Sequence, residues 1–208
     1  LHEMPHQLYE GKIKKLREKT QGQLIVKEYP TASAHSGHFK SLLNELALKK
    51  SFRPDVIFID YLNICASSRF KGGNISSYFY VKAIAEELRG LAVEFNVPIF
   101  SATQTTRTGF VSTDIGLEDT SESFGLPATA DFMFALMSNE ELEALGQMKV
   151  KQLKNRYNDP SINRAFIIGV DRSKMRLYDV QQASQNIVDA NQTDEKEDAY
   201  NKFSDFKL

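Results

Sequence analysis

The sequence predicts an α/β domain in which a mostly parallel sheet is closed at its C-terminal edge by antiparallel strands. Two short apolar runs, 56–59 and 97–102, flank an amphipathic helix expected over 77–95, and this alternation is typical of a parallel sheet. The first run reads Val-Ile-Phe-Ile, as in strands that are covered on both faces. Near the end of the chain, the apolar runs 165–170 and 175–180 flank a short polar turn, which predicts an antiparallel hairpin.

The N-terminal part is expected to contain two helices and a short strand. Charged residues with apolar positions three apart predict an exposed helix over 10–19, and the apolar run 24–26 before Pro30 predicts a strand. Ser36 is expected to cap the next helix, because a serine hydroxyl can accept a hydrogen bond from a free N–H of the first turn. The apolar stripe of that helix is Phe39, Leu42, Leu43 and Leu46.

The C-terminal part is expected to contain a polar loop, further strands and a tail. The stretch 103–117 is too rich in Thr, Ser and Gly for core structure, as in functional surface loops. Apolar runs predict strands over 131–137 and 149–156. Because polar residues dominate the end of the chain, we expect 181–208 to be a disordered tail and 1–180 to be one folded domain.

The composition is that of one ordinary globular domain. The chain has 208 residues, of which 41% are hydrophobic, enough to bury a core. No apolar run of the sequence is long enough to span a membrane. The single cysteine, Cys65, excludes an internal disulfide and favours a reducing compartment, so we expect a cytoplasmic protein. Because the first residue is Leu1 rather than methionine, we expect a fragment or a processed chain.

The charges are unevenly distributed, although the net charge is −1. The segment 112–145 carries eight acids and no Lys or Arg, whereas 147–176 carries eight bases against Asp159 and Asp171. Two interpretations remain open. The charges could form the dipolar surface of a single domain, or the basic face could meet an acidic neighbour or a phosphate.

Two polar residues follow the two expected parallel strands, Asp60 after the first and Gln104 after the second. Ligands bind at the carboxyl ends of strands in open α/β sheets, and a strand-end aspartate holds the Mg²⁺ of the nucleotide in many ATPases. A strand-end glutamine can bind a phosphate or orient a water molecule. Each residue alone is also typical of an ordinary turn, but the two together, separated by one helix, favour a nucleotide site.

Several segments resemble the DnaB-type hexameric replicative DNA helicases, in the order in which that family has them. Residues 55–62, then a helix, then 101–107 resemble its Walker B and strand-end glutamine segments. The segment 117–132 resembles the stretch before the next core strand, and 154–158 matches a Lys-x-Arg-x-Asn motif of the family. The resemblance covers roughly 9–180 and is strongest to a bacteriophage member.

The resemblance implies a RecA-like three-layer core that hydrolyses ATP with Mg²⁺ between the subunits of a homo-hexamer on single-stranded DNA. It implies that Asp60 holds Mg²⁺ and that Gln104 senses the γ-phosphate. It also implies that Arg156, with Lys154 beside it, reaches the ATP of the neighbouring subunit. The implied protein partners are a primase and a helicase loader, and no membrane is involved.

The DNA contacts that the resemblance implies fall on Arg107, Glu122 and Ser123. Many relatives carry an arginine at the position of Ser121, and the loop is acidic here. Contacts to DNA are therefore expected from backbone amides and Arg107.

A second departure from the family concerns the phosphate-binding loop. No GxxxxGK[ST] motif occurs in the sequence, so we expect it to precede Leu1 and this chain alone to be inactive. The triplet Glu3-Met4-Pro5 is similar to a Glu-Met-Pro of the family whose glutamate polarises the attacking water. We interpret Glu3 as a surface residue instead, because no strand can precede it.

Other interpretations stay open. The same fold could belong to a RecA-like recombinase or regulatory ATPase, or to a non-catalytic interaction module. Arg156 could also form a surface pair with Asp159 and have no role in a site. His35 and His38 have a metal-like spacing, but two histidines without further ligands are more typical of the exposed start of a helix.

Overall fold

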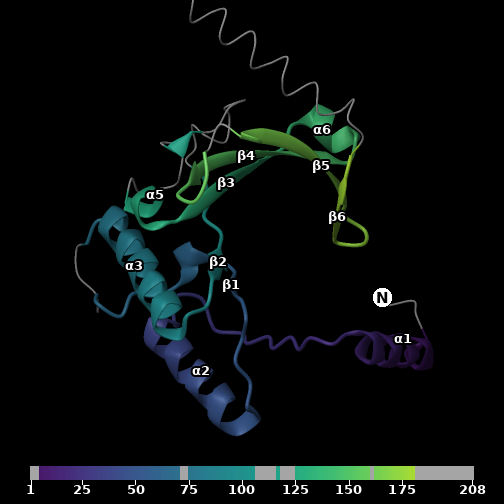
Figure 1. Cartoon of the computed structure of the whole chain (residues 1–208), viewed down its shortest axis with the longest axis horizontal. Coiled ribbons are helices and arrows are strands. Elements are labelled where there is room, and N and C mark those ends of the chain that lie inside the picture. Colours follow the sequence, from purple (N-terminus) through teal and green to yellow (C-terminus); the bar gives the residue numbers. More distant parts are fainter. Residues whose placement is uncertain (1–4, 71–74, 106–115, 118–124, 160–161, 181–208) are drawn as a thin grey trace, which may run out of the picture. The chain divides into compact units, whose positions relative to one another are not determined.

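The computed structural model describes residues 5–70, 75–105, 116–117, 125–159 and 162–180. The chain divides into two units, Leu1–Thr31 and Ala32–Leu208. The second unit confirms the expected α/β class, because it combines helices with a parallel and an antiparallel sheet (Figure 1). None of the described helices combines the length and the apolar character needed to cross a membrane. The expected tail, 181–208, and Glu3 lie outside the described residues, so the division of the chain at residue 180 stays a prediction.

The first unit consists of one helix and an extended segment. Helix α1 (His6–Lys19) begins earlier than expected and ends where expected. The Thr20 N–H and hydroxyl both donate to the Leu16 carbonyl, at 3.0 and 2.8 Å. The strand expected at 24–26 is wrong, since this segment belongs to neither sheet and Leu24 is 86% exposed. An apolar run becomes a strand only where a neighbouring strand takes up its N–H and C=O groups, and the described residues offer this run no such neighbour.

The second unit begins with helix α2 (Ser36–Lys50), whose cap differs from the expected one. The N-cap is His35, whose Nδ1 accepts from a first-turn N–H at 3.0 Å. His38 Nδ1 in turn accepts from the His35 N–H at 3.2 Å. Ser36 is not the cap, because its hydroxyl donates to the carboxylate of Glu87 at 2.8 Å. The ring nitrogens of both histidines therefore satisfy free N–H groups at the helix start.

The parallel sheet pairs β1 (Ile57–Ile59) with β2 (Ile99–Ser101), and helix α3 (Ser77–Phe95) lies between them in the chain. Both strands lie inside the expected apolar runs, and α3 has the bounds that its periodicity predicts. The helix ends at Asn96 in the left-handed conformation, with φ 51°, which asparagine adopts at lower cost than most residues. The chain then returns to the sheet as β2, with its carboxyl end beside that of β1.

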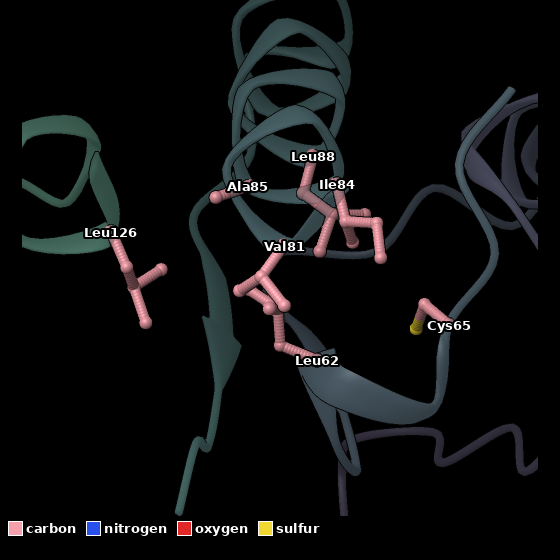
Figure 2. Packing of buried hydrophobic residues seen from close by; sticks show 7 residues of the cluster. All are labelled: Leu62, Cys65, Val81, Ile84, Ala85, Leu88 and Leu126. Atoms are coloured by element: carbon pink, nitrogen blue, oxygen red, sulfur yellow. The ribbon is translucent and has the colours of Figure 1, made fainter. Parts of the chain in front are cut away.

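The core of the second unit forms around α3. The buried cluster consists of Leu62, Cys65, Val81, Ile84, Ala85, Leu88 and Leu126. Figure 2 shows Leu62 of the 3₁₀ helix η1 (Leu62–Ile64) beside Val81 of α3, and Leu126 approaching from the short helix α5 (Gly125–Thr129). Ile84 is 1% exposed and is the most deeply buried member. The apolar face of α3 expected from the sequence therefore organises this core.

The carboxylate of Glu87 links three segments of this unit through hydrogen bonds. Glu87 on α3 accepts hydrogen bonds from the hydroxyls of Ser36, Ser67 and Ser68, at 2.8, 2.6 and 2.7 Å. The Ser68 N–H also donates to it at 3.0 Å. Burial alone would raise the pKa of Glu87, but these donors outweigh burial and lower the pKa to about 2. The start of α2 and the segment after η1 are therefore tied to α3 through one side chain.

The antiparallel sheet has the strand order β3-β4-β5-β6. Its strands are β3 (Phe132–Met137), β4 (Gln147–Asn155), β5 (Ala165–Asp171) and β6 (Arg176–Asp179). All four lie near their expected positions, and the hairpin of β5 and β6 is confirmed. The short helix α6 (Glu140–Ala144) joins β3 to β4. Within the described residues this sheet is larger than the parallel one, which consists of β1 and β2.

Candidate functional site

Asp60 and Gln104 follow the two parallel strands at the same edge of the sheet. Strand pairing puts Ile59 of β1 opposite Ser101 of β2. The Ser101 hydroxyl donates to the Ile59 carbonyl at 2.8 Å, which fixes the two strand ends side by side. Asp60 comes directly after this last pair and is exposed. The structure therefore places its carboxylate at the carboxyl edge, where ligands bind in open α/β sheets.

Two hydrogen bonds join the turns that leave the two strands. The Leu62 N–H donates to the Ala102 carbonyl at 3.1 Å. Gln104 Nε2 donates to the hydroxyl of Tyr61 at 3.4 Å. Because Tyr61 is the residue after Asp60, this bond brings the Gln104 amide to the turn that carries the aspartate.

A third bond between these turns involves residues that the sequence alone did not single out. The Thr103 hydroxyl donates to Asn63 Oδ1 at 2.8 Å. Both are ordinary turn residues in the sequence, and their link depends on the pairing of β1 with β2. Extending the parallel register past the strand ends would put Thr103 opposite Tyr61 rather than Asn63, so the sequence carries no signal for this bond.

The donor set at this edge suits a magnesium ion that is already bound to phosphates. Mg²⁺ in such sites keeps several waters and takes one or two protein carboxylates together with phosphate oxygens, and Asp60 offers one exposed carboxylate. Among the residues that the structure describes, no group of three or more His, Cys, Asp or Glu could cage an ion. One exposed carboxylate can take part in holding such an ion together with phosphate oxygens.

Arg156 lies just past β4 and pairs with an acid that its sequence neighbourhood does not indicate. Its Nη1 donates to Asp131 Oδ1 at 3.1 Å, and its Nη2 donates to the Ala128 carbonyl at 2.8 Å. The structure thus gives Arg156 an ion pair with Asp131, 25 residues earlier in the chain. The Arg156 side chain remains 44% exposed, so it can still contact another molecule.

Two further cations surround the same end of α5. Lys154 Nζ donates to the Pro127 carbonyl, and Arg89 of α3 forms an ion pair with Asp131 at 2.7 Å. Burial lowers the pKa of Lys154, and the positive charge of Arg156 lowers it further. The cluster therefore carries more positive charge than Asp131 can balance, which favours an anionic ligand.

The expected site residues form two groups in the structure. Asp60 and Gln104 lie together at the parallel edge, and Lys154 and Arg156 lie together at the end of β4. No hydrogen bond or ion pair between described residues joins one group to the other. The expected DNA-contacting residues, Arg107, Glu122 and Ser123, lie outside the part of the chain that the structure describes.

Comparisons with known proteins agree with this fold. No family model matches the chain. The chain is 48% identical over 177 residues to the DnaB-like replicative helicase of Enterobacteria phage T4, an alignment that covers 85% of this chain and 37% of that helicase. The chain therefore spans little more than a third of the length of this relative.

Two solved structures are similar in fold. A structure of a DnaB-like replicative helicase and its interactions with primase has a TM-score of 0.61 at 18% identity, covering 74% of this chain and 37% of that one. The second, an isolated ATPase domain, has a TM-score of 0.62 at 18% identity, covering 82% of this chain and 65% of that domain. At this identity the two structures support the fold alone.

The arrangement of strands and helices is that of part of a RecA-like fold. Over 85% of its length the chain is therefore similar to a DnaB-like replicative helicase.

Proposed function

We propose that this chain is the C-terminal half of the ATPase motor of a replicative DNA helicase. In the intact protein, the motor couples ATP hydrolysis to movement along single-stranded DNA and to unwinding of the duplex. The observation that carries the proposal is the placement of Asp60 and Gln104 at the adjoining carboxyl ends of β1 and β2. The high identity to the T4 helicase supports the same function.

Asp60 and Gln104 would act on the nucleotide bound in their own subunit. The exposed Asp60 carboxylate would hold Mg²⁺ on the phosphates, and Mg²⁺ would neutralise charge that develops during phosphoryl transfer. The Gln104 amide, fixed to Tyr61 at 3.4 Å, would hydrogen-bond the terminal phosphate and so respond to its presence.

Arg156 and Lys154 would act on the nucleotide of a neighbouring subunit in a homo-hexamer. They lie outside the Asp60 group but form a partly exposed cluster with positive charge in excess. A guanidinium can fork onto two phosphate oxygens, whereas an ammonium acts as a point charge. Arg156 therefore suits the transition-state contact, with Lys154 as a neighbouring phosphate contact.

The exposed parallel sheet supports the proposal that this chain works as part of a longer protein. Phe58 and Phe100 stack with ring centroids 5.4 Å apart, yet they are 71% and 48% exposed. Two strands alone make a marginal sheet, and large exposed aromatic pairs usually mark a surface that another segment covers. Because the sequence contains no GxxxxGK[ST] motif, we propose that the chain alone does not hydrolyse ATP.

The proposal extends to the partners of the intact protein. Arg107, Glu122 and Ser123 would contact single-stranded DNA. A primase and a helicase loader would bind the ring, as primase interacts with one of the structurally similar helicases. The location would be the cytoplasm of the cell in which replication takes place.

Site-directed variants of the intact helicase test the proposed site. Asp60→Asn should lower DNA-stimulated ATP turnover at saturating Mg²⁺ by at least about a hundredfold, because an electrostatic contact to developing charge is lost. Asp55→Asn, at the exposed start of the same segment, should leave turnover unchanged and serves as the control. Gln104→Ala should keep equilibrium ATP binding but lose DNA-stimulated hydrolysis. Equal turnover in the Asp60→Asn and Asp55→Asn proteins would rule out the proposed role of Asp60.

A further inference from the structure

A single carboxylate oxygen lies between two arginines at the end of the antiparallel sheet. Asp131 Oδ1 is 3.1 Å from Arg156 Nη1 and 2.7 Å from Arg89 Nη1. The three side chains come from three different elements or their ends, namely the start of β3, the end of β4 and helix α3. Asp131 therefore links the proposed phosphate-contacting arginine to a core helix.

The backbone fixes this arrangement independently of the side chains. The Arg156 N–H donates to the Asp131 carbonyl at 3.0 Å, and the next pair of the ladder is Phe132 with Asn155. Arg156 and Asp131 are thus opposite each other at the end of paired strands. Their ion pair is set by the sheet register, unlike a surface pair between two mobile side chains.

The contacts leave the Arg156 guanidinium with donors to spare. It uses Nη1 on Asp131 and Nη2 on the Ala128 carbonyl, while a guanidinium carries five N–H donors in a rigid plane. The two contacts fix the orientation of that plane, and the remaining donors are available to a ligand. Arg89 gives the Asp131 carboxylate a second anchor, since Arg89 also donates to the Thr129 carbonyl at 2.7 Å.

Charge at the cluster favours an anion. Among the described residues, the Asp131 carboxylate faces Arg89, Arg156 and Lys154. The lowered pKa of Lys154 reflects burial and then the neighbouring Arg156 charge. An added anion would offset the repulsion among the three cations. Carboxylate and phosphate oxygens both match a planar guanidinium beside an ammonium, and under the proposed function the anion is a nucleotide phosphate.

We propose that Asp131 is a positioning residue for Arg156. By holding Arg156 against Arg89, it presents the Arg156 guanidinium beside the Lys154 ammonium as one preset site for the nucleotide phosphates of an adjacent subunit. This inference rests on the proposed function of Arg156. Asp131 does not touch the nucleotide and acts through the orientation of the arginine.

The test compares variants of the intact helicase in DNA-stimulated ATP hydrolysis. Asp131→Asn keeps the shape of the side chain and removes its charge. It should lower kcat by about tenfold to a hundredfold, because a small misplacement of a reacting group costs that much. KM for ATP should stay within about threefold, since ground-state binding uses other contacts. Asp171→Asn, which removes a partly exposed carboxylate paired with Lys174 at 2.9 Å in the same sheet, is the control and should leave kcat unchanged.

A double variant separates positioning from a merely structural role. If Asp131 acts through Arg156, adding Asp131→Asn to Arg156→Ala should leave the residual single-turnover rate unchanged within about twofold. Additive losses in the double variant would overturn the inference. So would a normal kcat for Asp131→Asn in assembled rings.

Two further outcomes keep the inference and the proposed function apart. Should Asp131→Asn fail to assemble, Asp131→Glu keeps the charge that Arg89 requires but moves the carboxylate by one methylene. Its rings should assemble and show a lowered kcat, and an unchanged kcat would overturn the inference.

Near-normal turnover in Arg156→Ala would instead remove the proposed function of Arg156. An inactive Arg156→Ala with a fully active Asp131→Asn would overturn the positioning role alone.

Discussion

Replacing Glu87 by glutamine should destabilise the fold in a way that depends on pH. The Glu87 carboxylate accepts hydrogen bonds from Ser36, Ser67 and Ser68, and these bonds lower its pKa from 4.5 to about 2. Glutamine keeps the size of the side chain but loses the charge that the donors stabilise. Because the carboxylate is partly solvated, we expect a loss of about 1–2 kcal/mol in the free energy of unfolding, less than the whole pKa shift would give.

The direction of the pH dependence follows from the lowered pKa. The ionised carboxylate stabilises the folded chain at all pH values above its ordinary pKa of 4.5, and this contribution is lost as the pH falls toward about 2. The difference in unfolding free energy between wild type and Glu87→Gln should therefore be largest at neutral pH and should shrink between those two values.

Urea unfolding of the chain, followed by circular dichroism, measures this difference at each pH. The matched control is Glu86→Gln on the same helix, which removes exposed pairs with Arg69 and Lys82 and should cost less than about 0.5 kcal/mol. A Glu87→Gln difference that is the same at about pH 6 and at about pH 2.5 would refute the reasoning, because the effect would then not depend on ionisation.

Three other predictions concern the site, the core and the end of the chain. Under the proposed function, Arg156→Ala in the intact protein should lower DNA-stimulated kcat by about a thousandfold or more while sparing ATP binding. Arg172→Ala, which removes an exposed pair between the turn after β5 and α6, should not lower it, and equal kcat values would contradict this. Ile84→Ala should lower the unfolding free energy by about 2–5 kcal/mol, because Ile84 is 1% exposed, whereas Leu48→Ala at an exposed position of α2 should cost little in the same denaturation experiment. Deleting 181–208 should leave the thermal unfolding midpoint unchanged, and a large decrease would show that this segment packs on the core.

The apolar periodicity and end residues of a segment were enough to predict those elements whose bounds depend on the segment's own residues. The bounds of α3 follow from its apolar periodicity and from Asn96, which can end a helix in the left-handed conformation. The cap of α2 could not be predicted in this way. The hydroxyl of Ser36 is taken by Glu87, which lies 51 residues further along the chain, and His35 caps the helix instead.

The candidate site shows the same division between local and distant causes. The meeting of Asp60 and Gln104 at one edge follows from strand–helix–strand order, because parallel strands end on the same side of a sheet. The pairing of Arg156 with Asp131 needed the register of β3 against β4, which is shifted between Met133 and Phe134. No pattern in the sequence predicts that register shift, so the pairing of Arg156 with Asp131 could not be predicted.

The hydrogen bond between Thr103 and Asn63 links the polar stretch 103–117 to the segment that follows Asp60. Thr103, the first residue of this polar stretch, donates to Asn63 of η1 at 2.8 Å. Asn63 is three residues after Asp60, and Gln104 is the second residue of the stretch. Under the proposed function, a change at the terminal phosphate would move Gln104 and, through the backbone, Thr103 at the start of this stretch. Because Thr103 and Gln104 are adjacent in the chain, release of the phosphate from Gln104 and displacement of Thr103 would occur together.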